Sequence, residues 1–199
     1  MSTDLRARPG RDDFDRVVAE LEAFRWRPGI DVETIGAPQR IAPYGHAMEA
    51  GLGAGDEDQG LGRLILLHDP AGNDAWDGDW RLVTLVRADT DADMVADSLI
   101  GEVAWSWLVE ALDEHGAALT APAGTVTTVT SRSFGSLGAE PDRAEIEIRA
   151  SWTPLLDDPP GITAHLRAWQ QLMCQAAGLP PLPEKITPLR TAPLATGTR

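Results

Sequence analysis

The order in which two hydrophobic periodicities follow one another limits the fold of this chain more than any other feature. Apolar residues recur at helical spacing in three stretches, 13–25, 91–115 and 162–176, and strand-like patterns fill the stretches between them. Strands therefore follow one another directly, without the regular strand–helix alternation of a parallel sheet. We predict an α+β fold, with an antiparallel sheet of about six strands and three helices in the order α-β-β-β-β-α-β-β-α, the helices lying mainly on one face.

Two of the predicted strands belong at the centre of the sheet and two at an edge or bulge. Residues 63–68 and 80–88 are apolar on both faces, which is typical of central strands. Pro43 favours an edge or bulge, and a lack of large apolar residues favours an edge for 120–134. Residues 51–62 are predicted to be a solvated hairpin loop. The predicted strands are 30–35, 40–50, 63–68, 80–88, 120–134 and 144–152, the last alternating most clearly.

The predicted helix 91–115 has more apolar surface than one sheet can cover. Its main stripe contains Leu99, Val103 and Leu108 among others, and Met94, Trp105 and Val109 form a second flank outside that stripe. Glu102 lies on the acidic face beside this flank. Because aromatic residues are enriched at binding hot spots, the partner-binding candidates are Met94, Trp105, Val109 and Glu102. The alternative is that Trp105 is a core residue under the C-terminal tail.

Net charge and composition exclude several classes of protein. The formal charge of −14 argues against direct binding of nucleic acid, and no apolar run approaches the about 20 residues of a membrane span. Most of the net negative charge falls in 31–62 and 91–116, so a partner is sought there, with a plain solubilising face as the alternative. We expect a cytoplasmic protein with a flexible segment 1–11, one domain over 12–178 and a Pro-rich tail over 179–199.

The hairpin tip at 68–80 is the other candidate site. Its acids, its two tryptophans and nearby Arg40 suit a small ligand, and the ligand-binding candidates are Arg40, His68, Asp69, Trp76 and Trp80. Asp74, Asp77 and Asp79 are candidate Ca²⁺ or Mg²⁺ ligands, but they lack EF-hand spacing, and Asp, Asn and Gly are also the common turn formers. We therefore expect a structural turn, with no metal and no cofactor.

No motif for catalysis is recognisable. The four histidines show no ligand spacing, and the chain contains no GxSxG, CxxC or P-loop sequence. The single cysteine, Cys174, is expected to be a packing residue. The sequence therefore favours a non-catalytic protein, although chance pairs among 31 acids leave acid–base chemistry open.

Four segments together resemble a known family: RWRPGIDVETIGAPQRIAPYG, LLHDPAGNDAWDGDWRLVTLVRAD, EVAWSWLVEALDEHGA and AEIEIRASWTP. They resemble the actinobacterial domain-of-unknown-function family numbered 3000 over roughly residues 12–185. The resemblance implies a cytosolic actinobacterial protein with no assigned activity or catalytic residues, often encoded beside a ribonuclease-D-like protein. The element order also resembles that of secretion-chaperone-like proteins, minus one early strand, and those are acidic dimers that bind protein segments.

Three hypotheses for the function follow. The first is a non-catalytic protein that binds a protein partner or itself through the flank of helix 91–115. The second is an enzyme, or a binder of a metal or small ligand, with its site at the 68–80 tip. The third is an accessory protein to an RNA-processing nuclease, which contacts the basic nuclease rather than the RNA. Among these we favour the first.

Overall fold

The computed structural model describes residues 10–53, 58–156 and 161–179. The flexible segment predicted over 1–11 and the Pro-rich tail predicted over 179–199 lie almost entirely outside these residues. The helices are α1 (Arg11–Glu22), α2 (Ala92–Val95), α3 (Ile100–Glu114), α4 (Ile162–Ala176) and the short 3₁₀ helix η1 (Gly135–Leu137). The strands are β1 (Ile30–Ile35), β2 (Tyr44–Gly53), β3 (Asp58–Asn73), β4 (Gly78–Thr90), β5 (Leu119–Ser131) and β6 (Arg143–Pro154).

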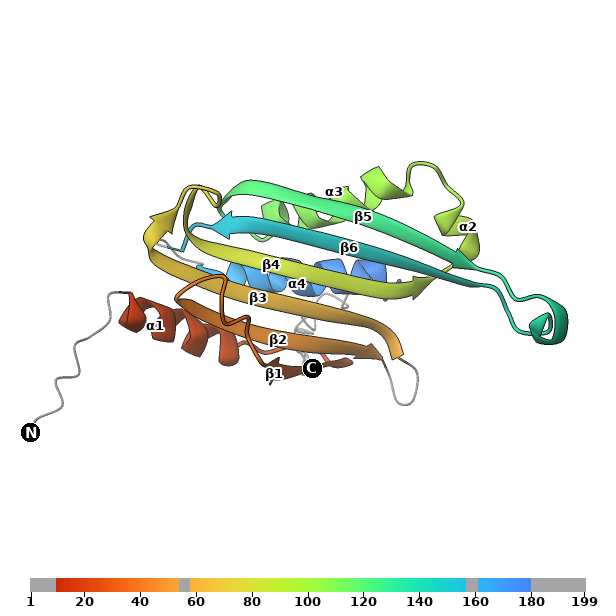
Figure 1. Ribbon diagram of the computed structural model, residues 1–199, viewed down its shortest axis with the longest axis horizontal. Helices are drawn as coiled ribbons and strands as arrows, with labels where there is room; N and C mark the ends of the chain where they lie inside the picture. Colours follow the sequence, from red (N-terminus) through yellow and green to blue (C-terminus); the bar gives the residue numbers. More distant parts are fainter. Residues whose placement is uncertain (1–9, 54–57, 157–160, 180–199) are drawn as a thin grey trace, which may run out of the picture.

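The strands form one six-stranded sheet in the order β1-β2-β3-β4-β6-β5. Every neighbouring pair is antiparallel, which confirms the predicted α+β class. Helices α3 and α4 lie behind this sheet in Figure 1, and the β5–β6 hairpin projects beyond it toward η1. The molecule therefore has two layers, a sheet and a set of helices on one of its faces.

The main core lies between the sheet and the helices. Trp152 and Trp169 are completely buried there, together with alternate residues of the central strands such as Leu66 and Leu82. Their indole N–H groups have partners, because Trp169 donates to Thr84 Oγ1 at 2.7 Å and Trp152 donates to His165 Nδ1 at 3.1 Å. These bonds place the even-numbered residues of β4 and β6 on the helix-covered face, and the pairing of Leu64 with Thr84 places those of β3 there too.

Gly62 allows helix α4 to approach the sheet closely. A Cβ atom built on Gly62 would overlap Met173 Sδ and lie 2.9 Å from Trp169 Cζ2. Contacts this short do not occur between real atoms, so a side chain at this position would push α4 away from the sheet.

The predicted helix 91–115 is two helices in the structure. Asp97 lies between α2 and α3, and its carboxylate accepts a hydrogen bond from the Leu99 N–H at 2.9 Å. This local bond favours a turn over a continuous helix. Leu99 and Val103, which were predicted to share the stripe that faces the core, are 60% and 42% exposed.

Strand β2 also differs from its prediction. It was expected at an edge or bulge because of Pro43, but it starts at Tyr44 and lies between β1 and β3. Most of the predicted loop 51–62 is paired, since Gly51 is opposite Leu61 and Leu52 is opposite Gly60. None of the described helices is both long and apolar enough to span a bilayer.

Candidate functional site

The odd-numbered residues of the central strands form a second sheet face, which we call the open face. Its middle contains Ile65 of β3 and Val83 and Leu85 of β4, with Ile65 paired to Val83 and Leu85 paired to Arg149 of β6. All three apolar side chains are partly exposed. No described helix covers them, because α1, α3 and α4 contribute to the core on the other side. An apolar centre on an uncovered sheet face is unusual for an antiparallel sheet, whose solvated face is normally polar.

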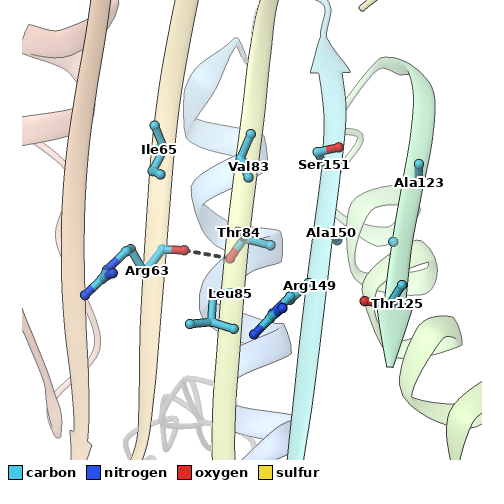
Figure 2. A pocket seen from close by; sticks show the side chains of 11 residues that line it. Arg63, Ile65, Val83, Thr84, Leu85, Ala123, Thr125, Arg149, Ala150 and Ser151 are labelled. Carbon is cyan, nitrogen blue, oxygen red and sulfur yellow. Dashed lines mark hydrogen bonds between the residues drawn. The ribbon is translucent and has the colours of Figure 1, made fainter. Parts of the chain in front are cut away.

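A hollow of about 560 Å³ lies on this face. Figure 2 shows the labelled side chains of Ile65, Val83 and Ser151 in one row across the strands, with Arg63, Leu85 and Arg149 in the next. The strand backbones form the floor of the hollow and arginines stand at its rim. The hollow is lined by Arg63, Ile65, Val83, Thr84, Leu85, Ala123, Gly124, Thr125, Arg149, Ala150 and Ser151.

The charged residues around the hollow are paired within the chain. Arg63 Nε donates to Glu49 Oε2 at 3.1 Å, and Arg149 Nε lies 2.9 Å from Glu147 Oε1. The arginine side chains are 46% and 67% exposed, so these ion pairs add little to stability. Side chains held this weakly can exchange partners when another surface approaches.

One end of the open face is covered by the chain itself. Leu67 and Ala47 are almost fully buried although neither belongs to the main core. A Cβ on neighbouring Gly45 would be 3.4 Å from Leu67 Cδ2 and 3.5 Å from Ala37 Cβ. The link between β1 and β2 therefore lies over this end, in front of the sheet in Figure 1, and leaves the middle uncovered.

Arg81 is a buried cation at the same end. Its Nη1 donates to the Ala121 carbonyl at 3.0 Å and to Thr153 Oγ1 at 3.2 Å, and its Nη2 donates to Ser151 Oγ at 2.7 Å. Burial lowers the pKa of this guanidinium. The bonds fix the irregular part of β5, where pairing shifts between Thr120 and Ala123 and Ala121 has a φ of 47°.

His68 and Trp80, two of the ligand-binding candidates, pack against each other beneath α1. Their rings stack with centroids 3.9 Å apart, and the ring of Phe14 from α1 lies over both. His68 Nδ1 lies 3.1 Å from the Asp79 carbonyl oxygen. Both side chains are nearly buried on the helix side, where α1 closes over them.

The remaining tip residues form turns. The Asp69 carboxylate accepts from the Ala71 N–H, and the Asn73 side-chain oxygen accepts from the Ala75 N–H. The Trp76 carbonyl accepts from the Thr153 hydroxyl. Within the described residues, no three His, Cys, Asp or Glu side chains form a metal-binding group, and Asp74, Asp77 and Asp79 form none. Arg40 is exposed in the link between β1 and β2.

The four partner-binding candidates on the predicted helix flank do not lie together in the structure. Trp105 is half-buried and packs on β5, where a Cβ on Gly124 would be 2.5 Å from its Cζ3. Trp105 and the exposed Val109 line a shallow groove of about 270 Å³ with Pro122. Met94 lies in α2, where its Sδ accepts from Thr90 Oγ1, and Glu102 is exposed on α3. Neither lines that groove.

The sequence contained a signal for the open face that its interpretation missed. Residues 63–68 are apolar on both faces, which predicts a central strand. In an antiparallel sheet with helices on one face, a strand that is apolar on both faces also places apolar side chains on the uncovered face. Ile65 and the Val83–Leu85 stretch carry this signal in the sequence.

Residues 11–187 match the model of a family described as a protein of unknown function (DUF3000). The chain belongs to the DUF3000 family. No curated protein shows significant similarity to the chain, and no solved structure does. The open face of this DUF3000 domain, its hollow and the α3 groove all lie within the matched residues.

Proposed function

We propose that this DUF3000 protein is a cytoplasmic protein-binding domain and that its open face is the surface on which another protein chain docks. The observation that supports the proposal is the partly exposed cluster of Ile65, Val83 and Leu85 at the centre of an uncovered face. Contiguous apolar surface rimmed by polar groups marks interaction sites on soluble proteins. The buried lone thiol of Cys174 suits a reducing compartment.

The shape of the hollow favours a protein surface over a small molecule. Ligand pockets enclose most of the surface of what they bind and bring several polar groups together. Here a strand floor forms the base, and the arginines at the rim already pair with carboxylates of the same chain. An apolar centre with a polar rim is the arrangement found in protein–protein interfaces.

The α3 groove is a second candidate for the same function. Val109 is 44% exposed beside the half-buried Trp105, and the acids Glu102 and Glu110 are exposed on the same helix. This arrangement suits a partner with basic and apolar residues, such as the nuclease of the accessory hypothesis. The groove is about half the size of the hollow on the open face, which is why we place docking on the sheet.

Photo-crosslinking from defined positions tests the proposal. A photoreactive amino acid replaces Leu85, Val109 or, as the exposed control on α3, Glu110. The variants are irradiated in native cells, and their adducts are identified by mass spectrometry. We expect protein adducts from position 85 and none above background from position 110. Adducts from position 109 alone would move the site to the α3 groove, and the absence of adducts from position 85 would contradict the proposal.

A further inference from the structure

The two edges of the sheet differ in how well they are protected from pairing with another chain. β1 and β5 lie at the two ends of the strand order. β1 has 6 residues with Asp31 and Glu33 among them, and short length and charge are common protections of an edge strand. β5 has 13 residues and none of them is charged, and the uncharged run extends over 117–131. A long edge strand without charge is a template for pairing with a further strand.

We infer that β5 binds an extended segment of a partner protein, which pairs with it as an added strand of the sheet. The inference goes beyond the proposed function, because it concerns the backbone edge of β5 and not the apolar floor of the open face. The segment has apolar side chains at alternate positions, facing α3, and basic side chains between them. The backbone of β5, the helix beneath it and the charge around it each support this assignment.

The backbone of β5 is regular, and its outer side has no partner strand. Ala123 to Ser131 pair without interruption with Ser151 to Arg143 of β6. In an antiparallel strand every second residue directs its N–H and C=O away from the paired neighbour. Within the part of the chain that the structure describes, no main-chain hydrogen bond joins this stretch to anything except β6. Every residue of the stretch except Val126 is exposed, so an incoming strand meets accessible donors and acceptors.

Helix α3 provides a floor on which an added strand can lie. The ring of Trp105 lies under Gly124 of β5, since a Cβ on that glycine would be 2.5 Å from Trp105 Cζ3. Trp105, Val109 and Pro122 line the α3 groove, and Val109 is 44% exposed. Turns of α3 are visible beyond the outer edge of β5 in Figure 1. A strand added to β5 would cover apolar side chains of this helix, and the burial of apolar surface favours binding.

The charge around this edge favours a basic segment. Residues 91–131 include α2, α3 and β5, and they contain seven acids and no lysine or arginine. Asp113 lines the groove, and Glu102 and Glu110 are exposed on α3. Opposite charge steers association and selects among partners. The segment that suits this edge therefore alternates apolar residues with lysine or arginine.

A second copy of the chain does not suit this edge, because its own α3 would be in the way. An antiparallel pair of two β5 strands is symmetric about an axis perpendicular to the sheet, so both α3 helices would lie on the same side. Paired strands are about 4.8 Å apart, whereas packed helices need about 8–10 Å between their axes. Since α3 packs directly on β5, the two helices would overlap. The occupant is therefore a single extended segment.

A peptide whose backbone can be blocked tests the inference. The probe is a fluorescein-labelled peptide of alternating lysine and valine, as long as the paired part of β5, and binding is measured by fluorescence anisotropy at physiological salt. We expect the probe to bind the wild-type protein, and a version N-methylated at two adjacent central residues to bind at least about tenfold more weakly. Both peptides have the same charge, so attraction to an acidic protein alone would make them bind equally. Equal binding, or no binding of the probe up to about 1 mM, would contradict the inference.

Variants locate the bound peptide. Thr128 is exposed on the helix side of β5, opposite Ile146, and Thr128→Lys should weaken binding at least about tenfold because an inward-pointing charge opposes edge pairing. Thr34→Lys is the matched control, since it makes the same change at an exposed position of β1, and it should stay within about twofold of wild type. Leu85→Lys on the open face should behave like this control. Binding that is lost with Leu85→Lys and kept with Thr128→Lys would move the segment to the open face, which contradicts the inference and leaves the proposed function standing.

Hydrogen exchange of the β5 amides separates a peptide from a second copy. In the free wild-type protein, the outward amides of 123–131 should exchange rapidly, and the probe should slow them. Protection that is already present in the free protein and increases with its concentration would show that a second copy occupies the edge, and would contradict the inference. Because this measurement and the comparison of the two peptides use wild-type protein, loss of folding in a variant cannot imitate the expected result.

Discussion

At the scale of single residues, His165 makes the stability of the protein depend on pH. Its side chain is fully buried, its Nδ1 accepts from Trp152, and burial lowers its pKa from 6.5 to about 4. Between these values the unfolded chain binds a proton that the folded chain does not, so stability falls as pH falls from about 6.5 to 4. Above about pH 6.5, the pKa of His165 in the unfolded chain, this loss of unfolding free energy is absent.

We therefore predict that His165 accounts for a loss of about 3 kcal/mol in unfolding free energy between neutral pH and about pH 4. The measurement is urea unfolding at several pH values, for wild type and for His165→Phe. The variant loses the Trp152 hydrogen bond at every pH, but its stability should depend less on pH in this window. Parallel curves for the two proteins would show that His165 titrates normally.

Arg81 belongs to the same scale. Its guanidinium is buried and donates to three neutral oxygens, of Ala121, Ser151 and Thr153. We predict that Arg81→Met lowers the unfolding free energy by about 2–3 kcal/mol, because buried acceptors lose a charged donor. Arg87→Met is the control, since Arg87 makes an exposed pair with Glu145 and should cost less than about 1 kcal/mol. Equal losses in urea unfolding would refute the anchoring role.

At the scale of elements, Gly124 determines how α3 sits on β5. A Cβ there would lie 2.5 Å from both Trp105 Cζ3 and the Arg149 carbonyl oxygen. Gly124→Ala should therefore destabilise the protein by about 1–3 kcal/mol, visible as a lower Tm. Gly101→Ala, on α3 with open space around it, should instead stabilise by up to about 1 kcal/mol through helix propensity. A Gly124→Ala variant with the Tm of wild type would mean that Trp105 can move aside to make room for the Cβ.

The elements also show where sequence reasoning succeeded and why it failed elsewhere. The helix 162–176 and the strand 30–35 were predicted with the bounds that the structure has, because their periodicity is uninterrupted. The break at Asp97 was missed because a single side-chain bond decides it. The glycines around the β2–β3 link gave no periodic pattern, and their pairing depends on neighbouring strands.

The candidate sites depended on packing that no linear pattern contains. His68 and Trp80 looked available at a hairpin tip, but Phe14, which is far away in sequence, closes over them. Trp105 was expected beside solvent or under the tail, and it packs on Gly124 of β5. Both outcomes follow from contacts between distant segments.

At the scale of the whole molecule, the central feature is that the two faces of the sheet are covered unequally. Helices shield one face of the sheet, while the other face has cover only where the β1–β2 link lies, within the part of the chain that the structure describes. Apolar side chains at Ile65, Val83 and Leu85 therefore face outward in a chain that is otherwise strongly acidic. Covering them with another protein surface would remove this apolar area from water, which favours association.

Thiol labelling measures most directly whether another protein covers the open face. Native Cys174 is buried, and burial raises its pKa against the opposing effect of Arg27, so its background reactivity with a maleimide should be low. A cysteine replaces Leu85 on the open face, or Glu110 on α3 as the control, and labelling is followed in fresh extract of the native cell and in dilute pure protein. The account predicts that position 85 is labelled at least about tenfold more slowly in extract while position 110 is unchanged. Equal rates for position 85 in the two conditions would contradict the claim that a protein docks on the open face.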